Sequence, residues 1–371
     1  MITWIKLPDI TDCQSHSAAW QAGISLESNL YAMYHSLDWL LCLDNPAHDR
    51  ISIAEHCNGD TTTYAAFRKR TMPLVYQFSR HLKFAPKLSV LDLLGCDLVG
   101  NMSYASLKSI TNSVWDNFPN IDAIYIKSVN VDSSIWREFS EHNWKIDKAQ
   151  IYMPNTERLF HYVKLAKTHQ EYIKGFKSKQ RISFKRKLKK VNEAFPGTVE
   201  LHRIDSLDDL DYLTESAKKI VQNSWKMNHL TQPIPESIKD ISFLRRVTEN
   251  GFLRSHVLSL DGKPCAFTVG YLYNGIYHCA DTAYDINYAK HSPGTVLLYK
   301  AIEDIINSDQ ADIIHFGITD AQYKRELSNC HSTDASLMIM RPTLTNKLRV
   351  LLHRSYRDTK AWLKSRQDQR R

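Results

Sequence analysis

The sequence predicts a mixed α/β (α+β) fold, in which a mostly antiparallel sheet is flanked by helices and a basic helical tail follows. Three strand-like runs are separated by Asp261-Gly262 and Asn274-Gly275, which favour the positive φ angles of tight hairpin turns. After His291 the apolar residues change from alternating to helical spacing. In the first half of the chain, helix-like and strand-like runs alternate, as is typical of α/β domains.

Residues 1–154 are predicted to form the first domain. Apolar residues at helical spacing predict the helices Ser28–Leu41, Tyr104–Trp115 and Ser134–Glu141. This half has no glycine-rich phosphate loop. Strands are predicted at Thr61–Phe67, Pro73–Phe78, Leu88–Leu94 and Ala123–Ile126.

A second domain is predicted over residues 155–345, after a boundary at Met153-Pro154-Asn155. It starts with a basic helix, Ser178–Phe195, which Pro196-Gly197 ends. A strand at Thr198–Ile204 follows. The next helix is predicted at Ser206–Trp225, with a capping-box pattern formed by its first serine and an aspartate three residues later.

The end of this domain is predicted to be a three-stranded meander, a helix, a fourth strand and a short polar helix. A helical crossover normally joins parallel strands, so the fourth strand should run parallel to the third. The meander strands are His256–Leu260, Cys265–Tyr273 and Ile276–Tyr284; the helix begins at Ser292, the last strand is Asp312–Phe316, and the short helix carries Tyr323 and Lys324.

The start of the crossover helix is predicted to bind a diphosphate. A helix N-terminus offers backbone N–H groups and the positive end of the helix dipole. A proline suits its first position, and Gly294 lets a ligand approach the backbone closely. Lys290 and His291 add charge. The predicted ligands of the phosphates are Lys290, His291, Ser292, Pro293, Gly294 and Thr295, with Lys324 from the short helix.

With these elements in this order, the chain resembles the GNAT acyltransferases, and most closely the branch of Fem-type peptidoglycan aminoacyltransferases and CelD-like proteins associated with exopolysaccharide synthesis. The resemblance covers about Phe176–Leu327 and is faint over Pro73–Trp136. The usual GNAT diphosphate loop, Arg/Gln-x-x-Gly-x-Gly/Ala, is reduced to Gly294. The motifs that carry the resemblance are the basic helix Ser178–Lys190, Ser224-Trp225, Ala283-Tyr284-Asp285, Ser292-Pro293-Gly294, and the spacing Gly317…Asp320…Tyr323-Lys324.

The resemblance implies two tandem GNAT-like domains, the first degenerate. It also implies a reaction in which an acyl group moves from acetyl-CoA or a longer acyl-CoA to an amine. The implied pathway is cell-envelope or polysaccharide biosynthesis, and no metal is expected. In this fold the third and fifth strands splay apart, and a backbone N–H of the third strand polarises the thioester. The reaction is therefore expected near His278–Asp281.

Three residues are candidates for proton transfer. Tyr323 stands where many GNAT enzymes hold a tyrosine that protonates the thiolate, and the neighbouring Lys324 is expected to acidify its phenol. Asp281 is a carboxylate within an apolar strand and is a candidate base. His278 is a third candidate on the same strand. Each has a plain structural alternative: a packed tyrosine, a carboxylate turned to water, and a core histidine.

The candidate residues for acceptor binding lie around the same strand and helix. Trp225 also suits a core position, and Asp285 and Asp320 also suit turn caps. These candidates are Trp225, His229, Tyr284, Asp285 and Asp320.

The bulk composition favours a cytoplasmic protein with an anionic partner. Seven scattered cysteines without a Cys-x-x-Cys pair indicate free thiols in a reducing compartment. The net charge of +8 resides in the second half. Residues 346–371 hold nine Lys or Arg against two Asp and form a predicted basic amphipathic tail, which could be a solvated helix or lie on the inner face of a membrane.

Two other functions remain open. The first is Fem-like transfer of an aminoacyl group from a charged tRNA, although no long coiled-coil insertion is seen. The second is a non-catalytic protein that holds a nucleic acid or an anionic membrane. The run Lys185–Lys190 has one neighbouring aromatic residue, so base stacking is poorly supported and nucleic acid is the less favoured partner.

Overall fold

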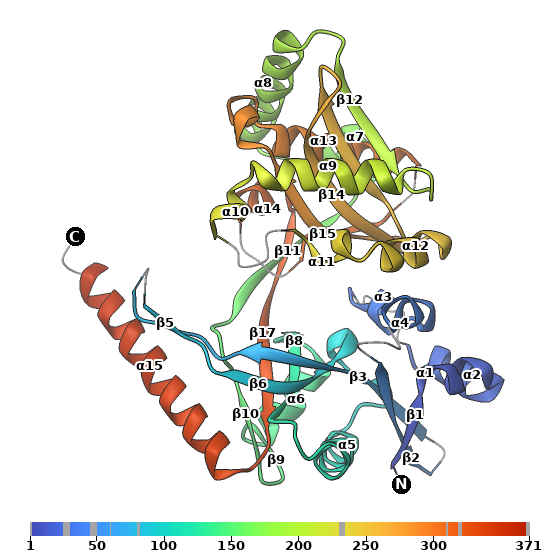
Figure 1. Cartoon of the computed structure of the whole chain (residues 1–371), viewed down its shortest axis with the longest axis vertical. Coiled ribbons are helices and arrows are strands. Elements are labelled where there is room, and N and C mark those ends of the chain that lie inside the picture. Colours follow the sequence, from blue (N-terminus) through green and yellow to red (C-terminus); the bar gives the residue numbers. More distant parts are fainter. Residues whose placement is uncertain are drawn as a thin grey trace. The chain divides into compact units, whose positions relative to one another are not determined.

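The computed structural model describes residues 2–24, 30–44, 50–59, 61–79, 82–229, 234–308, 311–317 and 321–368. The chain forms two compact units (Figure 1): unit 1 is Met1–Arg158 with Thr333–Arg371, and unit 2 is Leu159–Ser332. The sequence-based division assigned residues 333–345 to the second domain. They join unit 1 because strand β17 (Cys330–Met340) pairs with β8 (Ala123–Asn130).

Unit 1 contains a mixed sheet in the order β1-β2-β3-β6-β8-β17. The pair β6–β8 is parallel and the other neighbours are antiparallel. Strand β3 is longer than the sequence pattern predicts, because it pairs with β6 as far as Pro73. The remaining strand bounds are β1 Ile2–Lys6, β2 Ile51–Asn58, β3 Thr61–Pro73, β4 Tyr76–Gln77, β5 Lys83–Phe84, β6 Lys87–Leu93, β7 Val99–Gly100, β9 Lys145–Ile146 and β10 Ala149–Tyr152.

The helices of unit 1 cover this sheet with their apolar faces. Leu107, Ile110 and Val114 from one helix join Phe139 from another in the main core cluster. The predicted helix at residues 28–41 is interrupted at Ser36, whose hydroxyl accepts from the N–H of Trp39 and caps a new helix; residues 28 and 29 lie outside the described residues. The helices are α1 Leu7–Asp12, α2 Gln14–Gly23, α3 Ala32–His35, α4 Leu37–Leu43, η1 Leu94–Cys96, α5 Tyr104–Asn117, α6 Ser134–Glu141 and α15 Leu344–Asp368.

The C-terminal helix α15 is a docked part of unit 1 and not a separate tail. Val350 belongs to a buried cluster with Leu88 and Met338. The buried His353 contacts the Tyr152 hydroxyl through Nδ1, and its Nε2 lies 3.1 Å from the carbonyl of Val75. These contacts fix one face of the helix against the unit.

Unit 2 contains the predicted meander and crossover. Its sheet runs β11-β16-β15-β14-β13-β12. Asn274 (φ 44°) and Gly275 (φ 73°) form the predicted tight turn between β14 and β15. β15 and β16 are parallel, as the crossover predicts. The strands are β11 Arg158–Lys164, β12 Val199–Ile204, β13 Ser255–Leu260, β14 Lys263–Tyr273, β15 Ile276–Tyr284 and β16 Ile313–His315.

Helices cover both faces of this sheet, with α9 and α13 on opposite sides (Figure 1). The predicted capping box of α9 is wrong: the helix begins at Leu210, and the Ser206 hydroxyl donates to the Asp209 carboxylate, 2.6 Å away. The helices are α7 His169–Lys174, α8 Ser178–Ala194, α9 Leu210–Gln222, α10 Trp225–His229, α11 Glu236–Lys239, α12 Ile241–Glu249, η2 Ile286–His291, α13 Pro293–Ser308 and α14 Gln322–Leu327.

Two further features concern the whole chain. All seven cysteines are free thiols. Within the described ranges, no helix is long and apolar enough to cross a membrane.

Candidate active site

The site is built where β15 and β16 stop pairing. Their described pairing ends at His278 and His315. Just beyond, β15 contains a β-bulge: Cys279 pairs with Gly270 and Asp281 with Val269, which leaves Ala280 as the extra residue. A bulge bends a strand and re-aims the following side chains and backbone groups. The bulge therefore sets the direction of the second half of β15.

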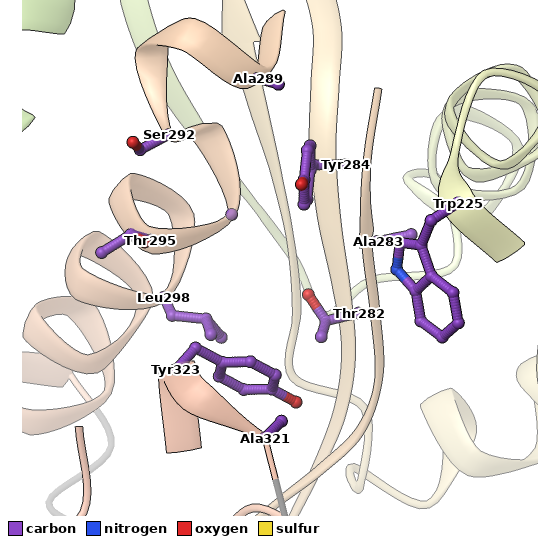
Figure 2. Close-up of a pocket in the computed structure, with 11 residues that line it drawn as sticks. Trp225, Thr282, Ala283, Tyr284, Ala289, Ser292, Thr295, Leu298, Ala321 and Tyr323 are labelled. Carbon is purple, nitrogen blue, oxygen red and sulfur yellow. The ribbon is translucent and has the colours of Figure 1, made fainter. Parts of the chain in front are cut away.

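A cavity of about 500 Å³ lies beside this half of the strand, entirely within unit 2. Figure 2 shows Thr282 and Tyr284 of β15 on one side and Leu298 of α13 on the other, with the ring of Tyr323 near them. The lining is mostly apolar, with a few hydroxyl groups. The lining residues are Trp225, Thr282, Ala283, Tyr284, Ala289, Ser292, Gly294, Thr295, Leu298, Ala321 and Tyr323.

The N-terminus of α13 forms one end of the cavity. Pro293 is the first helical residue, as predicted. Ser292 before it is left-handed (φ 54°, ψ 47°), and its carbonyl accepts from the N–H groups of Thr295 and Val296 at 3.0 and 3.1 Å. The Gly294 Cα faces Tyr284: a Cβ there would lie 3.2 Å from the ring carbon Cδ1. A larger residue at position 294 would therefore need the Tyr284 ring to shift by a few tenths of an ångström.

A lysine from α8 reaches the same helix start. Lys187 Nζ lies 3.4 Å from the Thr295 hydroxyl and 3.5 Å from a carboxylate oxygen of Glu326. The basic run in the sequence flagged this segment, but the sequence did not select Lys187. Its place beside α13 depends on how α8 packs, with Phe184 and Val191 facing the core.

His291, which was predicted to add positive charge at the start of α13, does not do so at neutral pH. Burial lowers the pKa of His291, and the cations Lys290 and Lys190 lower it further. Its ring packs against Phe195, with centroids 5.0 Å apart. Lys290 is exposed next to it. The positive charge at this end of the cavity therefore comes from lysines and from the helix.

Tyr323 faces the cavity, but its acidity differs from the expectation. Burial raises the pKa of the Tyr323 phenol well above its usual value, and the nearby Cys279 and Asp281 raise it further. Lys324 is 3% exposed, donates to the carbonyl of Gly317 at 3.3 Å, and has its Nζ 6.0 Å from the tyrosine ring centroid. The predicted acidification is wrong, since desolvation dominates. The burial of Lys324 is also unsuited to a phosphate ligand.

Asp281 is paired with a lysine that the sequence reasoning missed. Lys226 Nζ lies 2.9 Å from Asp281 Oδ1. Lys226 is buried, whereas the Asp281 side chain is about one-third exposed. Nothing local in the sequence marks this lysine, because its partner is contributed by a strand 55 residues further along the chain.

His278 lies in the core and not on the cavity wall. It is 1% exposed, and burial lowers its pKa to about 3. Its ring packs against His315, with centroids 4.9 Å apart. A neutral imidazole with no access to the cavity does not suit the role of base.

Only some of the residues predicted to bind the acceptor lie at the cavity. Trp225 and Tyr284 line the cavity. Asp285 instead caps η2: its carboxylate accepts from the N–H of Asn287 at 2.9 Å and from the side chain of Asn223 at 3.2 Å. The His229 side chain and all of Asp320 lie outside the described residues.

Comparisons with known proteins agree with this geometry. Residues 178–325 match the model of the acetyltransferase (GNAT) domain family. The chain is similar to the crystal structure of FemX, with TM-score 0.58, 11% identity, and 94% of this chain and 99% of that chain covered. None of the curated protein sequences matches it.

Two further solved structures have a similar fold. A conserved protein of unknown function from Bacteroides thetaiotaomicron has TM-score 0.52 and 12% identity, covering 91% of this chain and 100% of that one. A tandem GNAT protein from the clavulanic acid biosynthesis pathway has TM-score 0.52 and 8% identity, covering 92% and 98%. Residues 178–325 therefore match the GNAT acetyltransferase domain, in a chain whose fold is similar to those of FemX and a tandem GNAT protein.

Proposed function

We propose that unit 2 transfers an acyl group from an acyl-CoA to an amine within a ternary complex. The observation that carries the proposal is one cavity that joins the start of α13, where Lys187 lies, to the bulged part of β15 and the Tyr323 phenol. The diphosphate is placed at the helix start, where N–H groups, the helix dipole and lysines favour an anion. The thioester then lies along β15.

The chain supplies two of the groups that the reaction needs, and water takes the proton of the amine. A backbone N–H near the bulge at Ala280 hydrogen-bonds the thioester oxygen as negative charge develops on it. The amine nitrogen attacks the carbonyl carbon, the C–S bond breaks, and the sulfur leaves as a thiolate. The Tyr323 hydroxyl donates a hydrogen bond to that sulfur, and the amine proton passes to water.

Asp281 is assigned a supporting role in this scheme. Its carboxylate oxygen Oδ1 is already engaged by the Lys226 ammonium 2.9 Å away. The pair Lys226–Asp281 instead holds α10 against β15, and thereby holds Trp225 at the cavity wall.

We place the acceptor amine in cell-envelope or polysaccharide biosynthesis and the enzyme in the cytoplasm. The support for the pathway is the resemblance to Fem-type and CelD-like proteins, together with the fold likeness to FemX. The support for the compartment is that all seven cysteines are free thiols. A charged tRNA is the alternative donor, as the resemblance to Fem-type aminoacyltransferases implies.

The donor site is tested by calorimetry with CoA on the parent and two matched variants. Lys187→Gln removes the cation beside Thr295. Lys189→Gln makes the same change on the same helix, where the side chain is 76% exposed and paired with Glu193. We expect Lys187→Gln to weaken CoA binding roughly tenfold and Lys189→Gln to leave it unchanged.

Two outcomes would overturn the donor assignment. Equal CoA affinity in both variants would move the diphosphate away from α13. Stabilisation of the parent by charged tRNA but not by CoA or acyl-CoA, in a thermal-shift assay, would assign the donor to tRNA.

A further inference from the structure

Helix α15 has two faces with different surroundings. The inner face docks on unit 1 through the buried residues Asn346, Val350 and His353. The Arg357 guanidinium donates to the carbonyl of Met153 on the same side. These contacts fix which side of the helix points away from the unit.

The outer face is a stripe of large apolar side chains, each between 51% and 85% exposed. With 100° per residue, the members fall within an arc of about 120° opposite the docked face. Single exposed leucines are ordinary on a protein surface, but six large apolar side chains on one arc of a helix, at residues 344–352 and 362–363, are not. The stripe consists of Leu344, Leu348, Leu351, Leu352, Trp362 and Leu363.

The hairpin β4–β5 extends this apolar surface. It lies beside α15 (Figure 1). The Tyr356 hydroxyl donates to the carbonyl of Gln77 and accepts from its N–H, both at 2.8 Å, and the Phe78 ring packs on Tyr356 with centroids 5.2 Å apart. Phe78, Leu82 and Phe84 are each at least 60% exposed. Apart from Leu41, every exposed large apolar side chain described in unit 1 belongs to the stripe or to this hairpin.

Basic side chains flank the apolar stripe. The exposed cations Lys347, Arg354 and Lys360 lie along α15, and residues 346–371 hold nine Lys or Arg against two Asp. The Arg366 guanidinium lies 4.1 Å from the Trp362 ring centroid. Tryptophan with neighbouring arginine, on a helix with an apolar face and basic flanks, suits the boundary between headgroups and acyl chains.

We propose that α15 and the β4–β5 hairpin dock unit 1 on an anionic membrane surface, with the helix lying in the plane of the interface. The charge selects this occupant over a second copy of the chain. Two copies that meet along the stripe would bring their basic flanks together, whereas a helix seam normally pairs opposite charges across it. The proposal does not depend on the reaction assigned to unit 2.

The test is co-sedimentation of the full chain with phosphatidylcholine vesicles, with and without phosphatidylserine. We expect binding only to the vesicles with phosphatidylserine, weakened by salt. The triple variant Leu348→Gln, Leu352→Gln, Trp362→Gln removes apolar contacts, and the triple variant Lys347→Gln, Arg354→Gln, Arg366→Gln removes three cations. Each should lower the partition coefficient about a hundredfold.

Matched controls keep the result specific. Ile182→Gln changes an exposed apolar residue on α8 in unit 2, and Lys189→Gln changes an exposed cation there; both should bind vesicles like the parent. All variants change exposed side chains, so their unfolding curves should match the parent. Absence of binding to phosphatidylserine vesicles, or unchanged binding of the apolar variant, would overturn the proposal. Loss of a parental dimer in that variant, without vesicle binding, would assign the stripe to a second copy.

Discussion

At the scale of single residues, the environment of Tyr323 decides which chemistry its phenol can perform. Its pKa is raised by burial, whereas a free thiol has a pKa of about 8.5. Full proton transfer from this phenol to a departing thiolate is therefore uphill. The phenol can instead keep its proton and donate a hydrogen bond to the sulfur. This hydrogen bond strengthens in the transition state, as negative charge develops on the sulfur.

Replacing Tyr323 by Phe should therefore affect turnover more than binding. The ring stays, and only the hydroxyl is lost. We expect kcat to fall roughly 10²-fold, with little change in the Kd of acyl-CoA measured by calorimetry. Because the phenol stays protonated, parental turnover should not fall between pH 7 and 9 through its ionisation. Near-parental kcat in the Phe variant would make Tyr323 a packing residue.

His278 should make unit 2 sensitive to acid. Its pKa in the folded state is about 3, below the ordinary value of about 6.5 that applies when the chain is unfolded. Above pH 6.5 neither state is protonated there and the group contributes nothing. As the pH falls below 6.5, only the unfolded state gains the proton, so folding stability is lost, by about 2 kcal/mol at pH 5.

The variant His278→Leu removes this proton uptake. Urea unfolding at pH 7.5 and pH 5 should show that the variant loses about 2 kcal/mol less than the parent over this interval. An equal loss in both proteins would show that His278 can be protonated in the folded state.

At the scale of elements, the ion pair between Lys226 and Asp281 joins α10 to β15. Asp281→Asn leaves the buried ammonium of Lys226 without its carboxylate, which should cost about 1–2 kcal/mol after discounting for the partial exposure of Asp281. Lys226→Met together with Asp281→Asn should recover part of the loss, because no charge is then buried. Urea unfolding of the two single variants and the double variant measures the coupling.

An exposed pair on the neighbouring helix provides the control. Lys219 and Glu215 on α9 are each at least 70% exposed, so Lys219→Met should change stability by only a few tenths of a kcal/mol. If Asp281→Asn costs no more than this control, the pair does not hold α10 in place.

At the scale of the whole molecule, the C-terminal helix completes a unit that begins at the N-terminus. The buried Val350 packs with residues of β6 and β17, and the Asp122 carboxylate accepts from the Arg349 guanidinium at 2.6 Å. The sequence favoured a tail separate from the fold. In the structure, the inner face of α15 is part of the core of unit 1.

Truncation at Asn346 should therefore destabilise unit 1. Burial of one valine side chain alone is worth roughly 1.5–3 kcal/mol, and the loss of the Tyr152–His353 contact adds to this. We expect a lower urea midpoint for the unfolding of unit 1, whereas the apolar variant of the outer stripe should unfold like the parent. An unchanged midpoint after truncation would mean that the helix is not docked in solution.

The local elements of unit 2 followed from the amino-acid pattern alone. Asn274-Gly275 fixed a turn, the change of apolar period fixed the crossover helix, and Pro293 marked its start. The parallel pairing of β15 and β16 followed from that order. These features could be predicted because turn chemistry and helical periodicity act over a few neighbouring residues.

The electrostatics of the site and the return of the chain to unit 1 depended instead on the three-dimensional fold. The partner of Asp281, the direction of the Tyr323 pKa shift and the neutral state of His291 depend on burial and on charges contributed by distant segments. The pairing of β17 with β8 joins residues about 200 positions apart. Local patterns carry no information about such contacts, because they depend on which buried surfaces meet after the chain has folded.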